Sequence, residues 1–159
     1  MVESIFQAAA LVADLVDKPI DSKHSTNKGR HFCLIHTDKS ASYIIYKRQP
    51  FLSYGKSFGG DSVGESMNTE IASMLLKTKA EVNIYLVYPT GAVYSIPLDV
   101  LRKNLGNILL TDASTEATVS FPVDELKQIR GGNTRNPEVS EKHRLEDIED
   151  AKEEFWREN

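Results

Sequence analysis

Basic side chains gather in the first third of this 159-residue chain, with aromatic side chains close behind them. Between residues 18 and 56, eight Lys or Arg stand against two Asp, a net charge of +6. Lys and Arg can neutralise phosphates, and exposed Tyr or Phe can stack on unpaired bases. The pattern therefore predicts nucleic acid as a partner. The residues expected to contact it are Lys23, Lys28, Arg30, Lys47, Arg48, Tyr54 and Lys56.

The same residues have ordinary structural explanations. A cluster of one charge sign can be a solvated surface, and Phe51, Tyr54 and Phe58 can form a small apolar cluster beneath a loop. Charge is nevertheless segregated along the chain, because residues 136–159 hold nine Asp or Glu against four Lys or Arg, a net −5. Such segregation can mark a side of the protein that faces a polyanion. Both interpretations fit the sequence.

Several other chemistries lack the residues that they need. One cysteine and four scattered histidines give no zinc-binding spacing, and no phosphate loop, dinucleotide fingerprint or nucleophile elbow is present. Cys33 cannot form a disulfide within the chain and is expected to be a small core residue. Glu3 and Asp14 stand against a signal peptide, and no apolar run reaches the roughly 20 residues that span a bilayer. We expect a soluble, cytoplasmic protein without membrane contact.

The stretch Val82–Leu101 must organise the fold that positions the basic residues. Val82–Tyr88 is apolar on both pleat faces, which is typical of a central strand buried on two sides. Pro89 and Gly91 suit a turn into a return strand that ends near Ile96. The sequence therefore predicts an α/β fold, with a mixed central sheet of about five strands flanked by helices on both faces.

The remaining elements are predicted from apolar periodicity and from turn residues. Glycine and proline after residue 130 divide the chain into an α/β core domain over 1–130 and a linker with a charged C-terminal helix over 131–159. Phe155 and Trp156 in that helix are expected to be shielded by the domain or by a second chain. The expected elements are helices over 4–17, 65–79 and 144–156, strands over 31–36, 42–48, 108–110 and 117–121, loops over 21–29 and 50–64, and a joint over 131–137.

The order of these elements resembles the restriction-endonuclease-like core, the PD-(D/E)XK family. A helix, a short strand pair ending in a lysine, a second helix, and an apolar strand with its hairpin follow one another over residues 4–105. The run Val93–Leu101 is similar to the last strand and following helix of archaeal Holliday junction resolvases. The resemblance implies a nuclease in which an Asp and a Glu-x-Lys bind a divalent metal and position water.

Carried onto this chain, the resemblance implies a Mg²⁺ site at which Asp38 and Lys47 take part in catalysis. Ile45 stands where the family has its glutamate, so Glu65 or Glu70 from the following helix is expected to replace it. Mg²⁺ takes oxygen ligands, stabilises charge on the phosphorane and lowers the pKa of bound water, and a lysine adds electrostatic stabilisation. The implied catalytic residues are Asp38, Lys47 and Glu70, and the implied metal ligands are Asp38, Glu65 and Glu70.

Ordinary roles are open to these residues too, because Asp38 suits a turn and Glu65 suits the third position of a capping box from Ser62. The prediction is a nucleic-acid-binding protein with a restriction-endonuclease-like fold, which cleaves phosphodiester bonds with Mg²⁺ if the metal set is intact. DNA is expected ahead of RNA, and a homodimer is compatible with the pattern. The alternative is a non-catalytic interaction or structural protein that uses its C-terminal helix.

Overall fold

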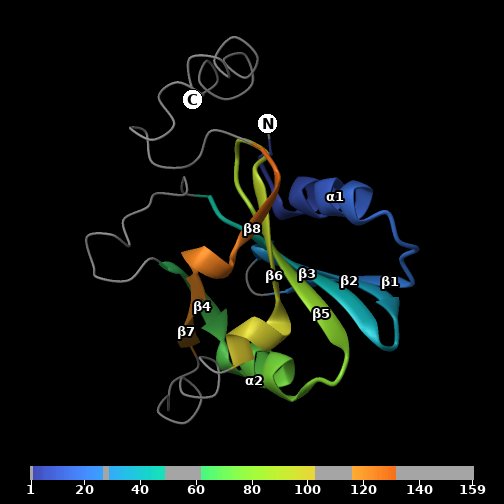
Figure 1. Ribbon diagram of the computed structural model, residues 1–159. Helices are drawn as coiled ribbons and strands as arrows, with labels where there is room; N and C mark the ends of the chain where they lie inside the picture. Colours follow the sequence, from blue (N-terminus) through green and yellow to red (C-terminus); the bar gives the residue numbers. More distant parts are fainter. Residues whose placement is uncertain (1, 27–28, 49–61, 103–115, 132–159) are drawn as a thin grey trace.

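A computed structural model describes residues 2–26, 29–48, 62–102 and 116–131. Two sheets and the helices that cover them make up these residues (Figure 1). The helices are α1 (Ile5–Val16), α2 (Thr69–Lys77), a helical segment over residues 98–102 and the 3-10 turn η3 (Val123–Glu125). The strands are β1 (Ser22–Thr26), β2 (His31–Thr37), β3 (Ser40–Tyr46), β4 (Ser62–Asn68), β5 (Glu81–Val87), β6 (Val93–Pro97), β7 (Glu116–Pro122) and β8 (Lys127–Arg130).

Six strands form the larger sheet, in the order β1-β2-β3-β5-β6-β8. β3 and β5 are parallel, and the other four pairs are antiparallel. A parallel neighbour requires a crossover connection, which usually contains a helix, and here the chain passes through β4 and α2 between β3 and β5. The predicted α/β fold with a mixed sheet is confirmed, and the strand predicted over Val82–Tyr88 lies in its interior.

Both faces of β5 are buried, as its sequence predicts. Ile84 and Leu86 are 1% and 0% exposed on one face, and Tyr85 and Val87 are 7% and 0% exposed on the other. α1 covers the second face, where it packs on β2 and β3, and α2 contributes Ala72 to the apolar cluster on the first. Burial of Ile84, Leu86 and Val87 stabilises the fold by about 1.5–3 kcal/mol for each side chain relative to exposure. β5 therefore joins the two halves of the core.

The predicted first helix is confirmed to within one residue at each end. The Ser4 hydroxyl caps α1 by accepting a hydrogen bond from the Gln7 amide at 3.2 Å. Asp17 ends the helix in a left-handed conformation, with φ at 52°, two residues before Pro19. A proline disfavours helical geometry in the residue before it, so the chain turns here from α1 toward the edge of the sheet.

The polar stretch predicted as a loop over residues 21–29 instead contains β1, which pairs with β2 along the sheet edge. Its sequence, SKHST, has none of the apolar alternation that marks a strand. An edge strand has one backbone side and much of its side-chain surface in water. Backbone pairing with the apolar β2 is therefore sufficient to order it, and apolar periodicity could not reveal it.

The start predicted for the second helix is also wrong, because residues 62–68 are extended. β4 pairs with β7 over their full seven residues and forms a separate two-stranded sheet. α2 begins only at Thr69, where the Asn68 side chain accepts a hydrogen bond from the Glu70 amide at 2.7 Å. The cap at Asn68 replaces the capping box predicted from Ser62. Glu65 consequently lies on a strand.

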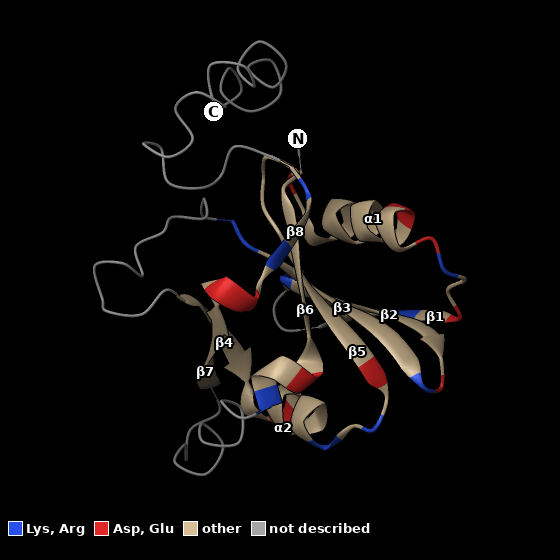
Figure 2. Ribbon diagram, viewed as in Figure 1, with Lys and Arg blue, Asp and Glu red and all other residues tan. Residues whose placement is uncertain are grey.

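Charged residues lie at both ends of the larger sheet. β3 runs from Ser40, level with Glu81, to Tyr46, level with Val87. We call the first end, beside the β2–β3 turn, the Asp38 end, and the second the Lys47 end. Figure 2 shows Lys and Arg where the chain leaves β3 and along β8. At the Asp38 end, Lys39 and Lys79 lie near the acids Asp38 and Glu81.

Several predictions fall outside the described residues. They are the segment 50–61 with Tyr54 and Lys56, the contact residue Lys28, the strand at 108–110, and the joint and helix beyond Gly131. The predicted division into a core domain and a C-terminal segment depends on that joint and helix. Within the ranges that are described, we find no helix with the length and apolar character needed to cross a membrane.

Candidate functional site

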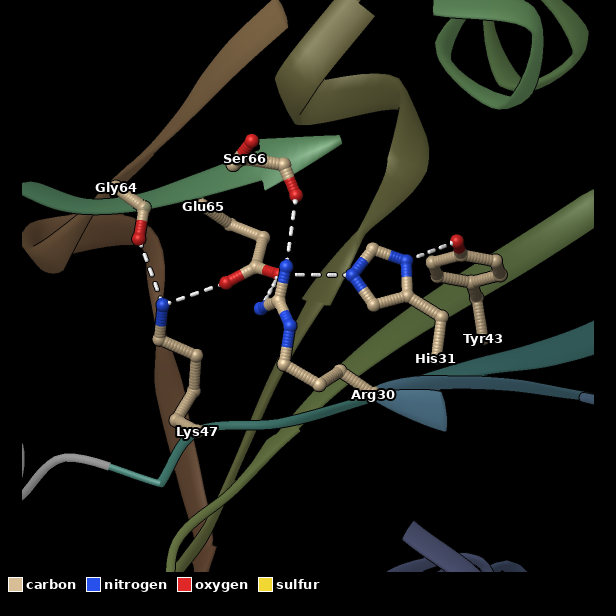
Figure 3. Close-up of polar contacts among 7 residues, drawn as sticks. All are labelled: Arg30, His31, Tyr43, Lys47, Gly64, Glu65 and Ser66. Atoms are coloured by element: carbon tan, nitrogen blue, oxygen red, sulfur yellow. Dashed lines mark hydrogen bonds and ion pairs between the residues drawn. The ribbon is translucent and has the colours of Figure 1, made fainter. Parts of the chain in front are cut away.

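Polar side chains from three strands meet at the Lys47 end of the larger sheet (Figure 3). Arg30 precedes β2, His31 begins it, and Lys47 follows β3. The antiparallel pairing of β2 with β3 holds them side by side, and the Tyr46 amide donates to the Arg30 carbonyl at 2.9 Å. β4 crosses over them and points Glu65 into the group. The site thus joins the two sheets.

Glu65 is the centre of this group, and its side chain is only 1% exposed. Lys47 Nζ lies 2.7 Å from Glu65 Oε1, and His31 Nε2 lies 2.8 Å from Oε2. Arg30 Nη1 donates to Oε2 as well. Both carboxylate oxygens therefore accept hydrogen bonds from cationic or imidazole donors. Charge-assisted bonds of this kind are about twice as strong as neutral ones.

The two cationic side chains are also bound to the backbone of β4. Lys47 Nζ donates to the Gly64 carbonyl at 2.7 Å, and Arg30 Nη2 donates to the Ser66 carbonyl at 3.4 Å. These carbonyls flank Glu65 in the sequence. Lys47 and Arg30 therefore hold the strand on both sides of the carboxylate, and their charged ends have defined positions.

His31 is fully buried between Glu65 and Tyr43. An ionised carboxylate only accepts hydrogen bonds, so Nε2 must carry the proton that faces Glu65. Nδ1 lies 2.5 Å from the Tyr43 hydroxyl, and the two rings meet edge to face at a centroid distance of 5.3 Å. In the neutral ring, Nδ1 accepts from Tyr43. Tyr43 thereby fixes the imidazole that supports Glu65.

The environment of Glu65 keeps its carboxyl ionised. Burial alone would raise its pKa, but hydrogen bonds from His31 and Lys47 and the positive charge of Lys47 outweigh burial and lower the pKa to about 2. Strongly perturbed carboxyls inside polar clusters are common at functional sites and also occur in structural ion pairs. Glu65 is thus a permanent anion at physiological pH.

A cavity of about 310 Å³ opens beside this network. Arg30, Lys47 and Arg48 contribute three positive charges to its wall, and Glu65 is the acid among the described residues that line it. Glu65 offsets one of these charges, which leaves a net charge of +2. Arg48 is exposed, whereas the side chains of Arg30 and Lys47 are 27% and 16% exposed. The remaining lining residues are Tyr46, Gly64 and Ser66.

Four of the predicted site residues come together here. Arg30, Lys47 and Arg48 were expected to contact nucleic acid, and Glu65 was expected to bind a metal. The structure gives Glu65 a different set of neighbours, because cationic donors occupy both of its oxygens. Lys23, the other described member of the expected contact set, lies on the edge strand β1 opposite Leu34 of β2.

The predicted metal set of Asp38, Glu65 and Glu70 is not assembled. Asp38 lies at the opposite end of β3 from Lys47, and a strand of this length separates its ends by about 20 Å. Glu70 is exposed in the first turn of α2. No group of three His, Cys, Asp or Glu within the described ranges could hold a metal ion. The residues at the Lys47 end therefore do not fit Mg²⁺, which prefers carboxylates that are free to coordinate it.

Sequence reasoning did not include His31 or Tyr43 in the site. A usable signal was present, because a hairpin with its turn at Asp38 and Lys39 brings residues 30 and 31 opposite the end of the next strand. A register shift between Ile35 and Thr37 then sets the pairing of residue 31 with residue 45. That register alone brings Arg30 and His31 next to Lys47. No comparable signal located Glu65, which is far along the chain and on a strand that was predicted as a helix.

Comparison with known proteins gives no relative: no family model, curated protein or solved structure matches this chain. The chemistry of the site must therefore be derived from its own geometry. That geometry is a concave wall with an excess of positive charge, held rigidly by one buried carboxylate.

Proposed function

We propose that this protein binds nucleic acid through phosphate contacts in the cavity at the Lys47 end of its sheet. The observation that carries the proposal is the convergence of Arg30, Lys47 and Arg48 on one cavity whose described acid, Glu65, is already paired. A net positive concave surface concentrates anions and attracts them from a distance. Phosphate contacts of this type supply most of the affinity of sequence-independent binding.

Unused hydrogen-bond donors support the same assignment. A lysine ammonium has three N–H donors and an arginine guanidinium has five. Lys47 directs two of its donors to the Gly64 carbonyl and to Glu65, and Arg30 uses Nη1 and Nη2 on Glu65 and Ser66. Donors therefore remain on both side chains for a phosphate, and the existing bonds hold these side chains in place before a ligand arrives.

The order of elements supports a restriction-endonuclease-like core as the scaffold for this binding. α1, the β2–β3 hairpin that leads into Lys47, α2, and β5 with β6 occur in the order of the resemblance that the sequence suggested, with β1 and β4 as additional strands. Our proposal is limited to binding, because the residues around Lys47 do not fit the Mg²⁺ site that cleavage by this family would need. The strand position that carries the glutamate in that family is Ile45 in this chain. Ile45 is apolar and fully buried in the core, so this position supplies no metal ligand.

Affinity measured against salt concentration tests the proposal. Labelled duplex DNA, single-stranded DNA and RNA are titrated with the full chain between roughly 20 and 200 mM salt. The logarithm of affinity should fall linearly with the logarithm of salt, by about 0.9 per phosphate neutralised on a duplex. Arg48→Gln should reduce that slope by about one contact, because Arg48 is exposed on the cavity wall.

Lys79→Gln is the matched control, since Lys79 is an exposed cation two residues before Glu81 at the Asp38 end. Its slope should equal that of the unchanged protein. Undetectable or salt-independent binding to all three nucleic acids would refute the proposal and favour an interaction protein. Cleavage of any of them with Mg²⁺ or Mn²⁺ would show that the binding assignment is incomplete.

A further inference from the structure

The larger sheet brings Arg130, the last residue of β8, close to the basic cavity. Residues Tyr46, Val87, Val93 and Arg130 are partners in consecutive strand pairs, so they lie level across β3, β5, β6 and β8. Three strand spacings separate Arg130 from Tyr46, a distance of about 14 Å. β8 is also parallel to β3, because two antiparallel pairings and one parallel pairing connect them. Both strands therefore end at the Lys47 end of the sheet.

The sequence that follows β8 has the charge that the cavity lacks. Residues 136–159 hold nine Asp or Glu against four Lys or Arg, a net charge of −5. The described lining of the cavity has a net charge of +2. The bonds to Glu65 show that Arg30 and Lys47 can both donate to a carboxylate, with Lys47 Nζ 2.7 Å from Glu65 Oε1. A second carboxylate would meet the donors on Arg30 and Lys47 that Glu65 leaves unused, and it would also meet the exposed Arg48.

Covalent geometry permits this contact. An extended chain spans at most about 3.3–3.6 Å per residue, and a helix rises about 1.5 Å per residue. Fifteen residues beyond Gly131, at Glu146, the chain could have travelled up to about 50 Å if extended and about 22 Å if helical. Either value exceeds the distance of about 14 Å across the sheet.

We propose that the acidic segment 138–158 binds the basic cavity of its own chain and competes there with nucleic acid phosphates. The competition part of this inference rests on the proposed function, whereas the contact within the chain does not. A ligand tethered this close has an effective concentration in the millimolar range, so even a weak contact is populated. Salt weakens the contact, because exposed charges are screened over about 10 Å at 0.1 M ionic strength.

The test uses the full chain with three acids neutralised, Asp147→Asn, Glu149→Gln and Asp150→Asn. The matched control neutralises Asp14, Asp21 and Glu81 in the same way; all three are exposed, and none lines the cavity. The two triple variants have the same net charge, so a difference between them reports position. Amide chemical shifts of Lys47, Arg48 and Gly64 are recorded at low salt without nucleic acid, and affinity for duplex DNA is measured separately.

The segment variant should shift the three amides toward their high-salt positions, and the control should not. The segment variant should also bind DNA at least about threefold more tightly than the control at low salt, with the difference lost at high salt. Equal shifts and equal affinities in the two variants would overturn the inference. Shifts that grow with protein concentration would overturn it too, because they would place the contact between chains. If the amides shift but no variant binds nucleic acid, the contact stands and the proposed function fails.

Discussion

Replacing Glu65 with glutamine should destabilise the protein in a way that depends on pH. The pKa of Glu65 is lowered from 4.5 to about 2, since hydrogen bonds from His31 and Lys47 prevail over the opposing effect of burial. A lowered pKa stabilises the folded state above pH 4.5, and this contribution is lost as pH falls toward 2. Each pKa unit corresponds to about 1.4 kcal/mol, so ionised Glu65 contributes about 3 kcal/mol at neutral pH.

Urea unfolding of the unchanged protein and of Glu65→Gln at several pH values measures this contribution. The difference in free energy of unfolding should be about 3 kcal/mol at pH 7 and about 1 kcal/mol at pH 3. Other carboxyls titrate in both proteins, so the difference isolates Glu65. Glu81→Gln is the control at an exposed position, where substitution changes stability by no more than about 0.5 kcal/mol. A difference for Glu65→Gln that stayed constant between pH 7 and pH 3 would refute this account of the network.

Two further predictions concern buried groups near the site and on the sheet. Tyr43→Phe removes the hydroxyl that lies 2.5 Å from His31 Nδ1. Urea unfolding should therefore show a free energy of unfolding lower by about 1–3 kcal/mol. An unchanged free energy of unfolding would mean that this hydrogen bond contributes nothing to stability. Burial raises the pKa of Cys33 from 9.0 to about 11, which lowers the fraction of reactive thiolate. At pH 8 a thiol reagent should therefore react about 100-fold more slowly with the folded protein than with the urea-unfolded chain. Equal rates would show that the thiol is not shielded.

Two features of the larger sheet follow from local sequence. β5 is apolar on both faces and lies in the interior, and the turn at Asp38 and Lys39 brings Arg30 and Lys47 to the same end of the sheet, although a register shift between Ile35 and Thr37 sets the final pairing. These features depend on contacts between neighbouring segments, which periodicity and turn residues specify. The place of Cys33 in the sheet was predicted for the same reason, and it is partly buried against the core.

Glu65 and β1 show what local sequence leaves undetermined. The run 62–68 resembles the start of a helix, but pairing with β7, 48 to 60 residues later in the chain, makes it a strand. Long-range pairing overrides propensity in this way because strand preference depends mainly on context. The predicted metal set assumed that Glu65 and Glu70 shared a helix, whereas Glu65 lies on β4 and Glu70 follows the cap of α2 at Asn68.

Glu65 lies on β4 of the smaller sheet, whereas His31 lies on the larger sheet and Arg30 and Lys47 lie directly beside its strands. The bonds of the site therefore connect the two sheets, and separation of the sheets would break them. Opening of β4 would break the bonds from Lys47 to the Gly64 carbonyl and from Arg30 to the Ser66 carbonyl along with both ion pairs. Arg30 and Lys47 would then face each other without the anion between them, so the opening is opposed by their repulsion as well. β4 and β7 should accordingly exchange their amide hydrogens as one unit, and that unit should open more readily when the pH falls toward the pKa of Glu65.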